Sequence, residues 1–372
     1  MSKVLVLTNS IGGLWSFRCE LMRKLLDSGF EVPIHCPLGE RIKDFEEMGC
    51  KVSVAENLNR RGMNPIKDIR LLFEYIKIIK KEKPDVVLTY TIKPNIYGGL
   101  ACRIMRVPYL SNITGIGTAI AGKGILAKLC IFLYRMGVGG VKTLFFQNSS
   151  NEKLFSDRKI ARNKHRIIPG SGVNLDKHVF TEYPQSDKIV FLFVGRVMKA
   201  KGIEEFLYAS EKLSEKYENV EFLICGFCDE KKYIPKIEEL SKKYNLNYLG
   251  SVLNIDEYYQ KSHCVVLPSY HEGTANVLLE GQATGRPVIS TDAPGCGETF
   301  VENVSGFLCE VGNGESLLKA MEKIINLSYD ERKEMGIRGR ENVEKNYDRN
   351  IVTNAYMEEI EKIIGGKYNE FV

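Results

Sequence analysis

The sequence predicts an α/β protein with two doubly wound domains, each a parallel sheet covered by helices on both faces. Two observations predict this fold. Short apolar runs alternate with helical patterns from the N-terminus onward, and the alternation restarts after a stretch rich in turn residues at 166–187. In addition, 372 residues are too many for one ordinary core, because domains hold roughly 100–200 residues.

The first half of the chain contains six predicted strands. Their sequences are KVLVLT, EVPIHC, KVSVA, DVVLTY, VPYLSNI and TLFFQN. The clearest helix between them spans 64–82, where Asn64 is the expected N-cap and Pro65 takes the first helical position. Its predicted apolar face consists of Ile66, Ile69, Leu72, Phe73, Ile76 and Ile79 or Lys80.

The second half repeats the pattern with six more predicted strands. They are KIVFLFVG, VEFLICG, LNYLG, CVVLPS, RPVIST and GFLCEV. The predicted organisation is an N-terminal domain at 1–170, a second domain at 171–350 and a final segment at 351–372. Ligands of such sheets bind beyond the carboxyl ends of the strands, so a cleft that both sheets face is the expected site.

Charge is distributed unevenly along the chain. Residues 1–170 hold 28 Lys and Arg against 14 Asp and Glu, whereas residues 171–372 hold 24 against 33. No acidic residue lies between Asp85 and Glu152. A basic surface with interleaved apolar residues is typical of proteins that bind nucleic acid or anionic lipid. Nucleic acid is disfavoured because no recognition motif accompanies the charge.

Composition indicates a soluble globular protein of a reducing cytosol. The ten cysteines show no spaced framework, and the Cys225–Cys228 pair follows a predicted strand, which favours turn and core cysteines over a redox site. The most apolar stretch, 125–141, contains Lys128 and Arg135 and is shorter than the ~20 residues that a membrane span needs. It could lie on a membrane surface.

The loop after the first strand, NSIGGLW, contains Gly12 and Gly13 before a helix expected near Ser16. Glycines here allow backbone to approach a ligand closely. The pattern is not G-x-G-x-x-G, and no acidic residue ends the second strand. A dinucleotide-dependent dehydrogenase is therefore disfavoured.

The loop after KIVFLFVG carries the cations Arg196, Lys199 and Lys201, followed by Gly202. An arginine can hold a diphosphate through its planar fork and a lysine as a point charge. No Asp-x-Asp occurs in the chain, so a metal-bridged diphosphate has no candidate ligands and no metal or other cofactor is expected.

The stretch SYHEGTANVLLEGQATGRPVIS places Glu272 before a predicted helix and Glu280 inside it, with Thr274 as the expected N-cap. A helix N-terminus attracts phosphate, so the two carboxylates would bracket a diphosphate and bind hydroxyls at its two ends. The amides of this N-terminus belong to Gly273, Thr274, Ala275 and Asn276.

Other interpretations of the two glutamates fit the sequence less well. His271-Glu272 lacks the second histidine of an H-E-x-x-H zinc site. A glycosidase pair needs carboxyls within about 5–9.5 Å, whereas eight helical positions span about 12 Å. Part of this segment is a turn, so a glycosidase pair is disfavoured without being excluded. Two exposed glutamates that merely flank a helix start remain an open alternative.

These motifs resemble the retaining glycosyltransferases of family 4, which have the GT-B fold. The resemblance covers essentially the whole chain and rests on GRVMKAKG, LPSYHEGTANVLLEGQATGRPVIST and GCGE. It implies that Arg196 and Lys201 contact the donor diphosphate, Glu272 the donor sugar and Glu280 the ribose. It also implies that Gly12 and Gly13 face the reaction centre, and that the final helix crosses back onto the N-terminal domain.

TYTIKPNIYGG, NITGIG and RRGMNP resemble the branch that adds hexoses or N-acetylhexosamines, with UDP the favoured donor base, to polyprenyl-diphosphate-linked precursors of capsule or O-antigen. Many relatives carry a histidine after the fourth strand, where this chain has 91–95 and Lys93 is the nearest polar substitute. The expected location is the inner face of the cytoplasmic membrane. The expected acceptor-side and membrane-side residues are Arg60, Arg61, Lys93, Asn95, Lys123, Lys128 and Arg135.

Two alternative functions remain open. A UDP-N-acetylglucosamine 2-epimerase shares this architecture and needs a nucleotide sugar but no acceptor. A non-catalytic nucleotide-sugar-binding protein would keep the donor site without turnover. The intact set Arg196, Lys201, Glu272 and Glu280 argues against the second alternative.

Overall fold

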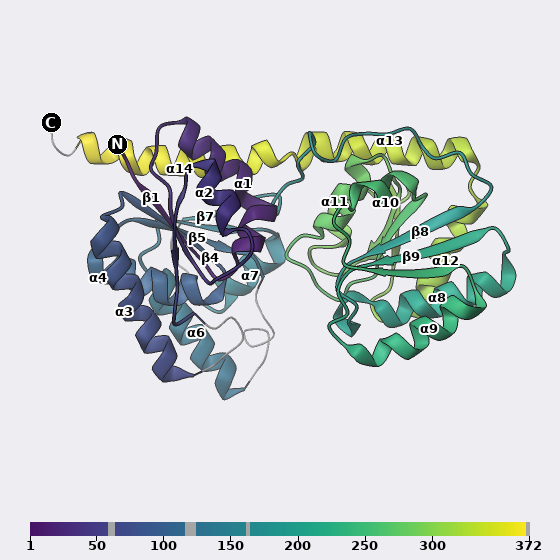
Figure 1. The fold of residues 1–372 in the computed structure, drawn as a ribbon, viewed down its shortest axis with the longest axis horizontal. Coiled ribbons are helices and arrows are strands. Elements are labelled where there is room, and N and C mark those ends of the chain that lie inside the picture. The colour runs from purple at the N-terminus through teal and green to yellow at the C-terminus, as the bar shows by residue number, and fades with distance from the viewer. Residues whose placement is uncertain (59–63, 116–123, 161–163, 370–372) are drawn as a thin grey trace. The chain divides into compact units, whose positions relative to one another are not determined.

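The computed structural model describes residues 1–58, 64–115, 124–160 and 164–369. The chain divides into two compact units, which are residues 1–171 with 350–372, and residues 172–349. Figure 1 shows that each unit is a sheet with helices on both faces. The predicted α/β fold with two doubly wound parallel sheets is confirmed.

The first unit has seven parallel strands in the order β3-β2-β1-β4-β5-β6-β7. The six predicted strands are all present. The short edge strand β7 was not predicted, because it has three residues and no long apolar run. The strands are β1 (Val4–Thr8), β2 (Pro33–Cys36), β3 (Lys51–Val54), β4 (Val86–Tyr90), β5 (Tyr109–Ile113), β6 (Thr143–Phe146) and β7 (His165–Ile167).

Alternating side chains of these strands pack into two separate apolar layers, one on each face of the sheet. Leu5 and Leu7 of β1 join a core with the helices on one face, and Val4 and Val6 join the core on the other face. The helices are α1 (Ile11–Asp27), α2 (Ile42–Met48), α3 (Pro65–Glu82), α4 (Gly99–Met105), α6 (Ile125–Val138), α7 (Ser149–Asp157) and α14 (Arg349–Asn369), with a π-helical turn η1 (Pro94–Gly98).

The last helix, α14, returns to the first unit after the chain has built the second. Its Tyr356 is fully buried and belongs to the same apolar layer as β1, and its hydroxyl accepts a 2.5 Å hydrogen bond from Asn112 of β5. Figure 1 shows this helix lying along the first unit next to α1. Helix α14 is therefore a structural part of the first sheet domain.

Helix α3 begins as predicted, with Asn64 accepting hydrogen bonds from the amides at 66 and 67. Its buried face was predicted only in part. Ile79 is buried as predicted, and Tyr75 is buried without having been predicted, whereas Ile66 and Phe73 are each 64% exposed. Periodicity identified an apolar stripe, but the sheet packs against a face rotated away from it, so part of the stripe is left in contact with solvent.

The second unit has six parallel strands, all predicted, in the order β10-β9-β8-β11-β12-β13. They are β8 (Ile189–Val194), β9 (Val220–Cys225), β10 (Leu246–Gly250), β11 (Cys264–Leu267), β12 (Val288–Thr291) and β13 (Gly306–Cys309). The helices are α8 (Ile203–Lys216), α9 (Ile234–Lys243), α10 (Asp256–Lys261), α11 (Asn276–Ala283), α12 (Gly314–Asn326) and α13 (Tyr329–Asn346), with 3-10 turns η2 (Lys199–Lys201), η3 (Lys231–Tyr233) and η4 (Gly297–Thr299).

In each sheet the strand order reverses beside the first strand of that unit. Strand β1 lies between β2 and β4, and β8 lies between β9 and β11. At such a reversal the connections on the two sides leave in opposite directions, which opens a crevice at the carboxyl ends of the two central strands. The loops after β8 and β11 are therefore the expected place for a ligand on the second unit.

Candidate functional site

The loop after β8 carries the first predicted cation, Arg196. Its Nη1 donates a 2.8 Å hydrogen bond to Oδ2 of Asp229, and about half of its side chain is exposed. Asp229 belongs to the loop after β9. The guanidinium therefore lies at the carboxyl edge of the sheet and is accessible to a ligand.

Lys201 ends the 3-10 turn η2 in the same loop and is followed by Gly202 in the left-handed conformation, with φ of 74°. A Cβ atom on Gly202 would stand 2.0 Å from the carbonyl oxygen of Pro268. The amide of Tyr270 also donates to the carbonyl of Ala200, at 3.0 Å. The loops after β8 and β11 are thus pressed together, and only glycine permits the contact at 202.

This contact brings Lys201 and Glu272 together as an ion pair. Oε1 of Glu272 also accepts a 2.8 Å hydrogen bond from the hydroxyl of Ser269. The two side chains of the ion pair are about one fifth and one seventh exposed. Two residues separated by 71 positions thereby form one charged site at the switch point.

The backbone around Glu272 is held by the loop after β12. The amide of Glu272 donates to the carbonyl of Pro294 at 3.0 Å, and the amide of Ala275 donates to that of Gly295 at 2.7 Å. Gly295 has φ of 77°, and a Cβ there would lie 2.4 Å from the carbonyl oxygen of Glu272. The glycines of this loop therefore serve to support the glutamate loop.

The predicted N-cap of the following helix was wrong. Helix α11 begins at Asn276 with Ala275 as its N-cap and no side-chain cap. Thr274 instead donates its hydroxyl to the carbonyl of Gly273 at 2.9 Å. The bond between Ala275 and Gly295 holds the chain in a turn, so the helix starts one residue later than the Thr274 pattern indicates.

Glu280 lies on α11 within a polar cluster that sequence reasoning missed. The hydroxyl of Tyr259 donates to Oε2 of Glu280 at 2.7 Å. The buried ring of His178 has Nδ1 2.5 Å from Oδ1 of Asp256 and Nε2 3.9 Å from Oε1 of Glu280. His178 lies in the segment before β8, and Tyr259 and Asp256 lie on α10, so their spacing in the sequence contains no signal of the contact.

On the first unit, Gly12 and Gly13 lie in the first turn of α1, which begins at Ile11 and not near Ser16 as predicted. Ser10 caps this helix by accepting the amide of Gly13 at 3.1 Å. A Cβ at Gly12 would meet no atom within 4 Å. Space is therefore left beside Gly12, at the carboxyl end of β1.

The segment after β4 contains the predicted acceptor-side residues Lys93 and Asn95. Lys93 forms a 2.6 Å ion pair with Asp68 of α3. Asn95 is 1% exposed and has its amide engaged by Thr89 and by the carbonyl of Asn112, so it has a structural role and was wrongly placed on the acceptor side.

The predicted membrane-side cations divide into three groups. Lys128 is exposed on α6. Arg135 donates two hydrogen bonds to the carbonyls of Arg158 and Lys159, which end α7. Arg60, Arg61 and Lys123 lie outside the described residues. Among the described residues, no group of three or more His, Cys, Asp or Glu could hold a metal ion, and no helix is long and apolar enough to cross a membrane.

Two doubly wound sheets with a cation and carboxylate site at a switch point are the architecture of the GT-B class, to which many glycosyltransferases belong. Comparison with known families agrees. The model described as glycosyl transferases group 1 matches residues 176–342, and the one described as glycosyl transferase 4-like matches residues 3–148. The two matches leave 149–175 and 343–372 uncovered, together with the first two residues. The chain thus joins a glycosyl transferase 4-like domain to a glycosyl transferases group 1 domain, and it is a glycosyltransferase.

Several curated proteins are similar along most of the chain. One is the N,N'-diacetylbacillosaminyl-diphospho-undecaprenol alpha-1,3-N-acetylgalactosaminyltransferase of Campylobacter jejuni, 27% identical over 96% of this chain and 98% of the relative. Another is the capsular polysaccharide biosynthesis glycosyltransferase CapM of Staphylococcus aureus, 26% identical over 84% of each chain. A third is an Escherichia coli UDP-Gal:alpha-D-GlcNAc-diphosphoundecaprenol alpha-1,3-galactosyltransferase, 25% identical over 80% and 82%.

Solved structures share the fold at lower identity. HepE of Anabaena, crystallised with UDP and glucose, has a TM-score of 0.79 at 16% identity over 97% of this chain and 100% of its own. A glycosyltransferase of Rickettsia africae has a TM-score of 0.79 at 21% identity over 98% of both chains. These likenesses establish the architecture.

Proposed function

We propose that this glycosyltransferase moves a hexose or N-acetylhexosamine from a UDP-sugar, with retention of anomeric configuration, to a glycan acceptor carried on a lipid diphosphate. The observation that carries the donor assignment is the Lys201–Glu272 ion pair, with Glu280 held separately by Tyr259. In this arrangement Lys201 would bind the diphosphate, and Glu272 beside it would bind the sugar. Glu280, further along on α11, would bind the ribose of the same nucleotide sugar.

The chemical task is to break the bond between the sugar and the diphosphate. Negative charge develops on the departing diphosphate, so cations that are already in place lower the barrier most. Lys201 and Arg196 supply that charge from one loop, and the N-terminus of α11 adds its dipole. Glu272 orients the donor sugar, and the departing phosphate takes the proton of the acceptor hydroxyl.

The acceptor class is supported by the relatives. The names of the Campylobacter jejuni and Escherichia coli enzymes both specify diphosphoundecaprenol-linked acceptors, and the Staphylococcus aureus relative acts in capsule synthesis. A role in bacterial surface polysaccharide synthesis follows for this chain. Since undecaprenyl chains reside in membranes, the enzyme would work at the inner surface of the cytoplasmic membrane.

Two helices of the first unit supply a surface for that contact. The α3–α6 face consists of the exposed apolar residues Ile66, Ile69, Phe73, Ile125, Leu129 and Phe132. Both helices pack onto the same apolar layer of the sheet, through other residues of their surfaces. Exposed apolar side chains at this density are typical of protein or membrane contact sites.

The charges of the α3–α6 face favour an anionic membrane over a protein partner. Lys67, Arg70 and Lys128 are exposed on the two helices. Helix α6 has no acidic residue. On α3, Asp68 pairs with Lys93, Glu82 pairs with Lys3, and Glu74 is only 16% exposed beside His35. Apolar residues would enter the headgroup layer, and each nearby cation adds about 1 kcal/mol of attraction to anionic lipid.

The donor assignment is tested with Glu272→Ala and, as a matched control, Glu302→Ala, an exposed glutamate outside the motifs. Purified variants are assayed with UDP-sugars and a polyprenyl-diphosphate-sugar acceptor, and UDP binding is measured by calorimetry. We expect Glu272→Ala to reduce transfer at least about 100-fold while UDP still binds. Transfer that survives the substitution would contradict the assigned role.

The same assay separates the proposed function from its rivals. A glycosyltransferase releases UDP only when acceptor is present and yields a longer lipid-linked glycan. An epimerised UDP-sugar formed without acceptor would identify an epimerase. Binding of UDP-sugars without turnover on any lipid-linked acceptor would identify a non-catalytic binding protein. Product stereochemistry, measured by NMR of the anomeric proton, tests retention.

A further inference from the structure

A cavity of about 570 Å³ lies on the first unit, away from the strand ends that carry the candidate site. It opens at the amino-terminal ends of β5 and β6, between the end of α4 and the last turns of α14. We call it the basic groove. It is lined by Cys102, Arg103, Arg106, Val107, Pro108, Tyr109, Gly140, Lys142, Thr143, Lys164, Glu359, Lys362, Ile363 and Gly366.

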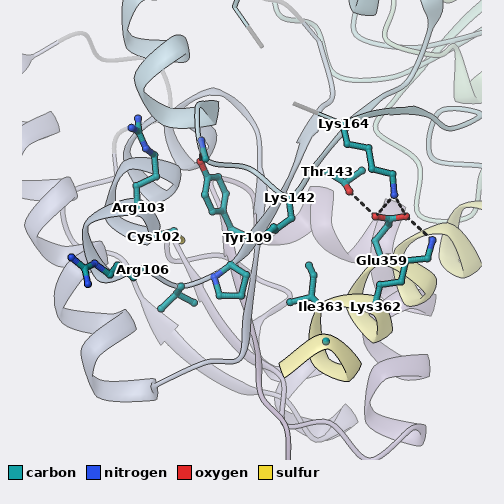
Figure 2. Close-up of a pocket in the computed structure, with 14 residues that line it drawn as sticks. Cys102, Arg103, Arg106, Tyr109, Lys142, Thr143, Lys164, Glu359, Lys362 and Ile363 are labelled. Atoms are coloured by element: carbon teal, nitrogen blue, oxygen red, sulfur yellow. Dashed lines mark hydrogen bonds and ion pairs between the residues drawn. The ribbon is translucent and has the colours of Figure 1, made fainter. Parts of the chain in front are cut away.

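Five cations and a single carboxylate line the basic groove. The carboxylate, Glu359, accepts hydrogen bonds from Thr143 at 2.6 Å, Lys164 at 2.9 Å and Lys362 at 3.0 Å. Figure 2 shows this cluster on one side of the groove, where it fastens α14 to the sheet. Lys164 and Lys362 therefore share one carboxylate, whose single negative charge offsets one of their two positive charges.

The other three cations, Arg103, Arg106 and Lys142, have no such partner. Within the part of the chain that the structure describes, no carboxylate lies within ion-pair distance of them. They are exposed, and all three belong to the acid-free stretch between Asp85 and Glu152. Figure 2 shows Arg103 and Arg106 on the side of the groove opposite Glu359, with Lys142 and Tyr109 between.

The surroundings of these cations are fixed and partly apolar. Nη1 of Arg103 donates to the carbonyl of Met136 at 2.6 Å, and a Cβ on Gly140 would stand 2.9 Å from the Arg103 side chain. Val107, Pro108 and Ile363 add apolar lining. A hollow with low-dielectric walls and unpaired positive charge concentrates anions.

We propose that the basic groove binds a phosphate-bearing anion, with Arg106 and Lys142 contacting the phosphate and the apolar lining contacting the rest of the molecule. Arginine and lysine are the usual protein partners of phosphate. The size of the groove is that of small-molecule sites. A soluble phosphorylated compound and a phospholipid headgroup share this chemistry. Because the groove joins α4 to α14, a bound anion would also hold α14 against the sheet.

The test uses the full chain and sodium pyrophosphate as the soluble probe, with binding followed by calorimetry. Arg196→Ala/Lys201→Ala removes two cations of the donor site. Arg106→Glu/Lys142→Glu replaces two positive charges of the basic groove with negative charges. Lys242→Glu/Lys243→Glu, which changes two exposed lysines of α9 outside the groove, is the matched control for net charge. Thermal unfolding checks that each variant folds.

We expect pyrophosphate to bind the donor-site variant and to slow hydrogen exchange in residues 355–366. Binding should fall at least about 10-fold when Arg106→Glu/Lys142→Glu is added to that variant, and little when Lys242→Glu/Lys243→Glu is added. If pyrophosphate does not bind but phosphatidylglycerol vesicles do, with the same dependence on Arg106 and Lys142, the ligand is a lipid headgroup. Equal loss with Lys242→Glu/Lys243→Glu, absence of pyrophosphate binding together with vesicle binding that does not depend on Arg106 and Lys142, or binding of neither probe would overturn the proposal.

Discussion

The phenol hydroxyl of Tyr259 donates a 2.7 Å hydrogen bond to Glu280 from a fully buried ring. His178, itself bonded to Asp256, faces the other oxygen of the same carboxylate at 3.9 Å. Glu280 is therefore held in one orientation before any ligand arrives. A carboxylate fixed in this way loses little freedom when it binds ribose hydroxyls, which favours tight binding.

Tyr259→Phe should weaken UDP binding by about 5- to 10-fold, because one hydrogen bond contributes roughly 1 kcal/mol. The loss should be smaller for 2′-deoxy-UDP, since part of the contact with Glu280 is absent already. Calorimetric titration of both nucleotides measures this difference. Tyr258→Phe is the control, and an equal effect of the two substitutions would contradict the role of the Tyr259–Glu280 bond.

Gly202→Ala should destabilise the second unit by at least about 2 kcal/mol. The alanine would take a left-handed backbone, and its Cβ would stand 2.0 Å from the carbonyl oxygen of Pro268. Gly12→Ala should instead leave stability unchanged or raise it by up to about 1 kcal/mol, because Gly12 is helical and has open space around it. Urea unfolding of both variants checks the contrast.

Glu359 should stabilise the first unit in a pH-dependent manner. Burial raises the pKa of Glu359, but hydrogen bonds from Thr143, Lys164 and Lys362 outweigh it and lower the pKa to about 2. A carboxylate whose pKa is lower in the folded protein than in the unfolded chain stabilises the fold at pH values above the unfolded-state pKa. This stabilisation is lost as the pH falls from about 5 towards 2.

Glu359→Gln should therefore lower the free energy of unfolding by about 1–2 kcal/mol near neutral pH, a figure reduced because both lysines are exposed to solvent. The difference from the parent protein should shrink as pH approaches 2. Glu358→Gln, next to it and half exposed, is the control. Urea unfolding at several pH values measures the two free energies of unfolding. A difference between variant and parent that does not change with pH would contradict the prediction.

Phe73→Asp/Phe132→Asp should reduce binding to anionic vesicles, because two apolar groups of the α3–α6 face would carry negative charge instead. Sedimentation with phosphatidylglycerol vesicles measures the bound fraction. Leu253→Asp, an equally apolar and fully exposed site on the second unit, is the control. Binding of the parent protein should weaken in high salt, and unchanged pelleting of the Phe73→Asp/Phe132→Asp variant would count against this surface.

Transfer should continue in excess EDTA. Arg196, Lys201 and the N-terminus of α11 provide the positive charge that the departing diphosphate needs, and the chain has no Asp-x-Asp motif. Initial rates with and without chelator are compared at saturating donor. Activity that disappears with EDTA and returns with Mg²⁺ or Mn²⁺ would show that a metal ion takes part.

The sequence by itself determined the fold class, the positions of twelve strands along the chain and the loops that carry Arg196, Lys201, Glu272 and Glu280. It could do so because alternating strand and helix patterns are local, and because polar residues after consecutive parallel strands must meet at one sheet edge.

Tertiary structure alone decided which groups meet those residues. The contact of Gly202 with Pro268, the hold of Tyr259 and His178 on Glu280, and the start of α11 at Asn276 depend on segments far apart in the chain. The exposed apolar residues of α3 and the basic groove beside α14 likewise depend on the orientation in which each helix packs against the sheet. Such packing is set by the shapes of distant surfaces, which periodicity and spacing do not encode.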